Sequence, residues 1–125
     1  MITQDSYNNA SLAFVGDAVY SLFVREALAQ EANDSSKVLH SRAVTEVRAL
    51  AQARAYSALQ SFLKDGEMTI MRRGRNSHCG SPSNGASRVD YQKSTGVECL
   101  FGWLWLTGQD KRARELFSII RQSLD

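Results

Sequence analysis

Apolar residues recur every three or four positions along most of the chain, and no stretch shows the sustained apolar–polar alternation of a half-buried strand. With Asn8 or Asn9 and Ser35 or Ser36 as candidate N-caps, this spacing predicts five helices. Their ranges are 9–29, 36–64, 67–73, 91–107 and 110–124, of which the second is long, whether straight or bent. Residues 74–90, rich in Gly, Ser and Asn, are predicted to form a loop of the length that is often functional. We therefore expect an all-α fold, a helical bundle.

The helix predicted over residues 91–107 is apolar nearly all round. Its i, i+3, i+4 positions are apolar, and Trp103 and Leu106 extend the apolar character to other faces. A helix of this kind is buried in a core or in a subunit interface. We therefore read the two tryptophans, Trp103 and Trp105, as packing residues, and Cys99 as a core residue.

Composition fits one soluble domain over residues 1–125. Hydrophobic residues make up 43% and charged residues 22%, and the net charge of +2 is too small to name a partner. The polar start has no signal peptide, and no apolar run approaches the ~20 residues that span a bilayer. Cys79 and Cys99 fit neither a disulfide framework nor a zinc site, as expected for thiols in a reducing cytoplasm. We expect a cytoplasmic protein.

Two acidic residues stand where core residues are expected. Asp17 lies in Leu-Ala-Phe-Val-Gly-Asp-Ala-Val, and Glu98 lies in Thr-Gly-Val-Glu-Cys-Leu-Phe-Gly. A buried carboxylate needs a partner or a metal ion. Gly16, Gly96 and Gly102 flank these acids, and glycine in a helix is usually retained for a close approach. If the two helices cross there, the carboxylates converge.

Oxygen-only ligands favour a hard cation such as Mg²⁺, which often takes only one or two protein carboxylates. A phosphodiester substrate would then complete the coordination shell, and water on the metal could attack it. The alternative is that Asp17 and Glu98 are ordinary buried acids, each neutralised by an arginine.

A basic run precedes the predicted loop. Three arginines fall within four residues, and Arg88 and Lys93 flank the far end of the loop. Arginine binds phosphate bidentately, and the lack of interleaved aromatic residues favours duplex RNA over stacked single strands. A solvated basic run without function is the alternative. The run and its neighbours offer as candidates Arg72, Arg73, Arg75, Asn76 and Lys93. Of the lone histidines, His40 reads as a surface residue, and His78 could touch phosphate or be inert.

The two acidic segments resemble the signature motifs of ribonuclease III, in which the aspartate and the glutamate are metal ligands. Their order and separation also match, and the resemblance covers nearly the whole chain. Further acids of that family are replaced here by Ala10, Ala13 and Thr95, and we expect no double-stranded-RNA-binding domain after this one. This reduced set, with Arg-Gly-Arg-Asn76 and Tyr91-Gln-Lys-Ser-Thr, is similar to Mini-ribonuclease III, in which the catalytic domain stands alone.

The resemblance implies an Mg²⁺-dependent endoribonuclease, with Mn²⁺ as a substitute, that cuts double-stranded RNA as a homodimer with two active sites along one groove. It implies 5′-phosphate and 3′-hydroxyl ends with a short 3′ overhang, and maturation of the large-subunit (23S) ribosomal RNA precursor as the cellular task. Asp17 and Glu98 would be the catalytic metal ligands, the arginine-rich segment would bind RNA, and Thr95 would orient Glu98 or a water on the metal.

Two other readings stay open. The loss of acids at Ala10, Ala13 and Thr95 motivates a catalytically inactive double-stranded-RNA-binding protein on the same fold. A helical interaction module without an RNA role is the third, and it predicts no salt-dependent affinity for duplex RNA.

Overall fold

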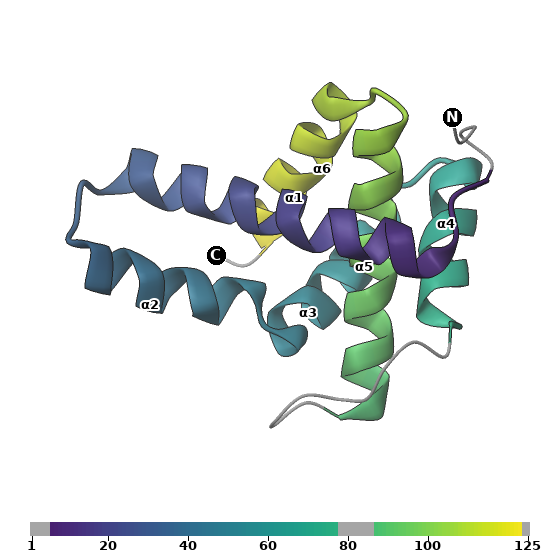
Figure 1. Cartoon of the computed structure of the whole chain (residues 1–125), viewed down its shortest axis with the longest axis horizontal. Helices are drawn as coiled ribbons and strands as arrows, with labels where there is room; N and C mark the ends of the chain where they lie inside the picture. Colours follow the sequence, from purple (N-terminus) through teal and green to yellow (C-terminus); the bar gives the residue numbers. More distant parts are fainter. Residues whose placement is uncertain (1–5, 78–86, 124–125) are drawn as a thin grey trace.

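A computed structural model describes residues 6–77 and 87–123. These residues form six helices and contain no strand, which confirms the all-α prediction (Figure 1). The helices are α1 (Asn9–Glu31), α2 (Ser36–Val47), α3 (Ala49–Leu59), α4 (Asp65–Arg75), α5 (Arg88–Leu106) and α6 (Asp110–Ser123).

Side-chain caps fix the starts of three helices. The side chain of Asn8 accepts a hydrogen bond from the Ser11 amide at 2.7 Å, and Ser35 caps α2 in the same way. Ser87 accepts a hydrogen bond from the Asp90 amide and begins α5. Each cap satisfies one of the amide groups that a helix N-terminus leaves without an intrahelical partner. The first two confirm the caps expected from the sequence.

The prediction of one helix over residues 36–64 is wrong, because the chain leaves the helical conformation at Arg48 and forms two helices. This residue is extended (φ −69°, ψ 160°) and serves both as the C-cap of α2 and as the N-cap of α3. The helix α3 ends at Leu59, and α4 begins at Asp65, two residues earlier than predicted. The turn lets α3 leave α2 and pack against α5. It contains neither glycine nor proline, so the apolar spacing runs through it without a signal.

The predicted loop over residues 74–90 is also too long at both ends. The helix α4 continues to Arg75, and α5 begins at Arg88. The centre of the loop, with His78 and Cys79, lies outside the described residues.

The helix α5 is the centre of the fold, as its all-round apolar character predicted. It packs against α1, α3 and α4, and α1 crosses it steeply (Figure 1). The buried residues of α5 pack with aromatic rings of α1 and α6, which meet edge to face. Among the largest fully buried side chains are Tyr20, Leu28, Tyr56, Phe101, Leu104 and Leu116. No helix within the described residues is both long and apolar enough to cross a membrane.

Glycines set the distance between α1 and α5. A Cβ atom on Gly16 would lie 1.6 Å from the backbone oxygen of Glu98, and one on Gly102 would lie 1.9 Å from that of Leu12. No real carbon atom approaches an oxygen so closely, so only glycine allows this crossing. The close approach expected from Gly16 and Gly102 is therefore present, and it lies beside both acidic residues.

Candidate metal centre and nucleic-acid interface

The crossing of α1 and α5 brings the carboxyl groups of Asp17 and Glu98 together. Their side chains are hydrogen-bonded to each other, with Asp17 exposed and Glu98 largely buried. Burial and then the negative charge of Asp17 raise the pKa of Glu98 from 4.5 to about 8. Glu98 therefore tends to keep its proton at neutral pH in the metal-free protein.

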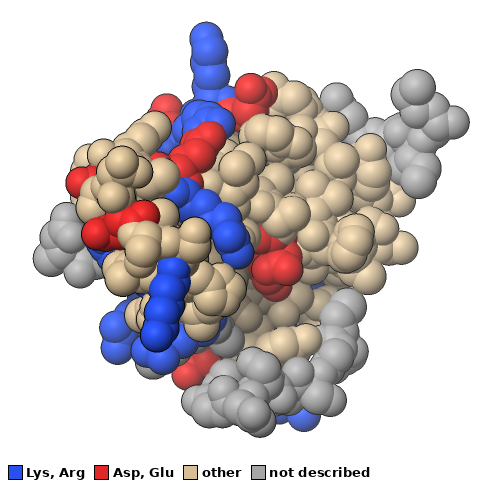
Figure 2. Space-filling view, turned by 60° about the vertical axis from the view of Figure 1, so that its left-hand side comes forward, with Lys and Arg blue, Asp and Glu red and all other residues tan. Residues whose placement is uncertain are grey.

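Arginine does not neutralise these acids. None of the ion pairs among the described residues involves Asp17 or Glu98, although six other acids pair with arginines. Figure 2 shows acidic and basic side chains mixed on the left of the view and few charged side chains to the right of them. The alternative of two separately neutralised acids therefore does not describe this chain.

The arrangement fits a hard divalent cation. The donors are carboxylate oxygens, and a cation between them would relieve their mutual repulsion. Within residues 6–77 and 87–123 no third His, Cys, Asp or Glu joins the pair. A nearby side-chain oxygen, Gln52 Oε1, is buried without a hydrogen-bond partner. Two carboxylates and one spare neutral oxygen suit Mg²⁺, which retains several waters.

Sequence reasoning missed Gln52. Its side chain is 2% exposed and forms hydrogen bonds with Glu98 and, through Nε2, with the Val47 carbonyl oxygen at 2.7 Å. The available signal was a lone amide between the alanines of Ala51-Gln-Ala53. The amide turns toward Glu98 only because α3 begins after the turn at Arg48, which a single helix over residues 36–64 does not contain.

Thr95, predicted to orient Glu98 or a water on the metal, is buried on α5. Its hydroxyl donates a hydrogen bond to the Tyr91 carbonyl oxygen at 3.0 Å, one turn earlier in the same helix. This bond uses the only proton of the hydroxyl, so any contact with a ligand would have to be as an acceptor. The orienting role stays a prediction.

The predicted RNA-binding residues gather where α4 ends against α5. Arg72 and Asn76 are exposed there, and Arg75 lies over the ring of Tyr56 with 5.7 Å between guanidinium carbon and ring centroid. A Cβ atom on Gly96 would lie 3.3 Å from the Arg75 amide nitrogen, so this end of α4 touches α5 one turn after Lys93. The half-buried Lys93 therefore belongs to the same basic end of the molecule.

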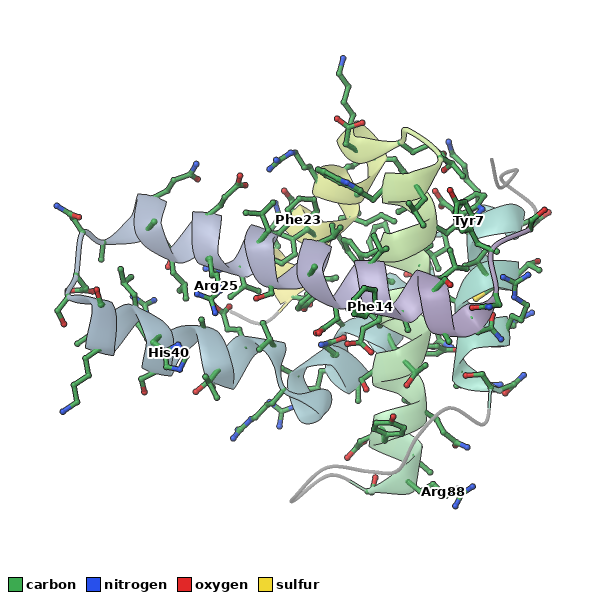
Figure 3. All side chains as sticks on the ribbon, viewed as in Figure 1. Tyr7, Phe14, Phe23, Arg25, His40 and Arg88 are labelled. Carbon is green, nitrogen blue, oxygen red and sulfur yellow. The ribbon has the colours of Figure 1, made fainter. Side chains whose placement is uncertain are left out.

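Arg73 is held differently from its neighbours. Its Nε donates a hydrogen bond to Asn9 Oδ1 at 2.8 Å, and its Nη2 donates to the Tyr7 carbonyl oxygen at 3.5 Å. This arginine thus ties the end of α4 to the start of α1, the helix that carries Asp17. Arg88, at the other side of the loop, is exposed at the first turn of α5 (Figure 3).

Comparisons with known proteins place the chain in a family. The family described as Ribonuclease III domain matches residues 10–109. The chain belongs to the ribonuclease III family. A Mini-ribonuclease 3 of Streptococcus pneumoniae is 35% identical to this chain, and the match covers 100% of this chain and 99% of that protein. One from Symbiobacterium thermophilum is 39% identical over 85% of this chain and 82% of its own.

A crystal structure of a protein from Fusobacterium nucleatum superposes with a TM-score of 0.85, at 21% identity over 95% of each chain. It confirms the fold. Membership of the ribonuclease III family makes the chain an endoribonuclease of the type that acts on double-stranded RNA. The resemblance drawn from the acidic motifs is therefore confirmed, as is the expectation of an enzyme.

Proposed function

We propose that the chain cleaves double-stranded RNA with Mg²⁺ held by Asp17 and Glu98. The supporting observation is that these two carboxyls meet at the glycine-lined crossing of α1 and α5 without a cationic partner among the described residues. Family membership supplies the reaction class, and the acid pair supplies the candidate centre within this chain. Mn²⁺ offers the same preference for oxygen ligands and should substitute.

The residues would divide the work as follows. Bound Mg²⁺ supplies positive charge to a phosphate and lowers the pKa of water. Asp17 and Glu98 hold the cation and fix its place against the strand to be cut. Arg72, Arg75 and Lys93 hold the RNA backbone, and Asn76 adds a neutral donor at the end of α4.

Arg73 belongs to the same proposal with an added task. Because Asn9 and Tyr7 already bind its guanidinium, we expect Arg73 to fix the basic end of α4 relative to the acid pair as well as to contact phosphate. Thr95 is kept as a candidate for orienting Glu98 or a water on the metal.

A homodimer is part of the proposal. Phe14 is 81% exposed on α1, one turn before Asp17, at the crossing with α5 (Figure 3). Leu22, two turns further along α1, is also exposed. Apolar side chains of this size in a row favour contact with a second protein surface, and an identical subunit would pair them by symmetry. Such a partner would lie beside the acid pair.

The cellular role follows the named relatives and the reaction class. We propose large-subunit (23S) ribosomal RNA precursor as the target in the cytoplasm, with 5′-phosphate and 3′-hydroxyl ends and a short 3′ overhang. The similarity to proteins named Mini-ribonuclease 3 supports this target.

One assay tests the centre. Purified protein is mixed with a structured duplex RNA and Mg²⁺, and Asp17→Asn is compared with Asp110→Asn, an exposed acid of α6 outside the site. We expect Asp17→Asn to abolish cleavage and Asp110→Asn to leave it unchanged. Cleavage that survives Asp17→Asn removes this residue from the centre. Binding of RNA without cleavage by the parent protein would favour the inactive RNA-binding protein instead.

A second experiment tests the RNA contacts. We expect Arg72→Ala and Lys93→Ala each to weaken duplex binding and to reduce the slope of log affinity against log salt by about 1. Lys111→Ala, on exposed α6, is the matched control and should leave the slope unchanged. Unaltered slopes for both site variants would place the phosphate contacts elsewhere.

A further inference from the structure

Gln52 occupies an unusual place for an amide. It lies in the first turn of α3, directly after the bend at Arg48, and only 2% of it is exposed. Its Nε2 donates to the carbonyl oxygen of Val47, the last residue of α2. The turn at Arg48 thus directs this side chain inward, where it caps one helix and reaches Glu98 on another.

The hydrogen bonds fix the orientation of the amide. The Val47 carbonyl oxygen accepts only from a donor, so the nitrogen must face α2. The second N–H of Nε2 is then free to serve the Glu98 carboxylate, and the interaction with Gln52 opposes the rise in the pKa of that group. The nitrogen side of the amide thus faces the Val47 carbonyl oxygen, and the acceptor Oε1 faces elsewhere.

Oε1 of Gln52 is buried and has no hydrogen-bond partner within the described residues. Leaving a buried acceptor unpaired is unfavourable, so native proteins usually supply a donor. Water bound to a cation is a strong donor of this kind. Resting on the proposed function, we infer that Gln52 is a positioning residue of the cation site: its amide nitrogen holds Glu98, and its oxygen accepts a hydrogen bond from the hydration shell of the cation.

The same helix provides a matched control. Tyr56 lies one turn after Gln52 on α3, is 1% exposed, and also has a buried oxygen without a partner. Its ring, however, contacts the α4 side of α5, near Gly96 and Arg75. If the loss of any unpaired buried oxygen on α3 were enough to weaken metal binding, Tyr56→Phe and a substitution that removes the Gln52 amide would lower the Mn²⁺ affinity equally.

The test measures Mn²⁺ affinity by calorimetry on the metal-free full chain, so its readout does not depend on RNA cleavage. We expect Gln52→Met, which keeps the volume, to weaken Mn²⁺ binding about ten-fold, the effect usual for groups that orient metal ligands. Tyr56→Phe should leave it unchanged. Gln52→Glu keeps an oxygen and adds negative charge, so we expect it to tighten binding and to serve as the deciding variant if Gln52→Met does not fold.

The outcomes separate this inference from the proposed function. If Gln52 only caps α2, Gln52→Met will be less stable in urea but will bind Mn²⁺ as tightly as the parent, and Gln52→Glu will not bind Mn²⁺ more tightly. These results would overturn the inference. If Asp17→Asn still abolishes Mn²⁺ binding and cleavage in that case, the proposed centre stands without Gln52. If the parent protein binds no Mn²⁺, the proposed centre itself fails.

Discussion

The crossing of α1 and α5 can be tested by adding one methyl group. In Gly16→Ala, the new Cβ would lie 1.6 Å from the Glu98 backbone oxygen and 2.9 Å from the Gly102 amide nitrogen. Ordinary carbon–oxygen contacts are about 3.5 Å, so the helices must separate locally by more than ~1 Å. Neither atom belongs to a flexible side chain that could move aside.

The separation loosens the core behind the crossing. Val19 and Tyr20 on α1 pack in one cluster with Leu100, Phe101 and Leu104 on α5, all buried. Overpacking of a core costs about 1–3 kcal/mol, and a clash with backbone lies at or above the upper end. We expect Gly16→Ala to lower the free energy of unfolding by at least about 3 kcal/mol, or the Tm by roughly 10 °C.

The assay is urea unfolding followed by circular dichroism, with Gly66→Ala as the control. Gly66 lies in the first turn of α4, and a Cβ there would meet nothing within 4 Å. Alanine should therefore stabilise that variant by up to about 1 kcal/mol, through its better helix propensity. A Gly16→Ala protein within about 1 kcal/mol of the parent would refute the close crossing. In the folded fraction, the widened crossing should also weaken Mn²⁺ binding, since Asp17 moves away from Glu98.

Two further predictions concern charge. Folding raises the pKa of Glu98 to about 8. The stabilisation that protonated Glu98 gives the metal-free protein is therefore full below pH 4.5 and is lost as the pH rises through about 8. Glu98→Gln should flatten this decline, so that its free energy of unfolding in urea rises relative to the parent by up to ~1.4 kcal/mol per pH unit. Plots of unfolding free energy against pH that run parallel for the two proteins would contradict the raised pKa. Burial opposes the charge of Glu67, but hydrogen bonds from Arg112 and the Lys64 amide outweigh it and lower its pKa. Arg112→Met should cost about 3 kcal/mol at pH 7, and this cost should shrink as the pH falls from about 4.5 through the lowered pKa of Glu67. A cost that does not change over this pH range would show that packing, and not charge, is lost.

Sequence by itself determined the fold class, most helix positions and the identity of the two acids. The reason is local: helical spacing of apolar residues and capping side chains such as Asn8 are readable within one turn. An acid and a glycine inside an apolar helix are also local anomalies, and they marked Asp17 and Glu98 before any contact was known.

Tertiary structure decided what those residues meet. The bend at Arg48 has no glycine or proline, and only the packing of α3 against α5 requires it. Gln52 acquires its place beside Glu98 through that bend, and Arg73 is bound by Asn9, 64 positions away in the chain. Contacts between residues so distant in the chain depend on how the helices cross. Apolar spacing does not predict a crossing, because it specifies only which face of a helix is buried.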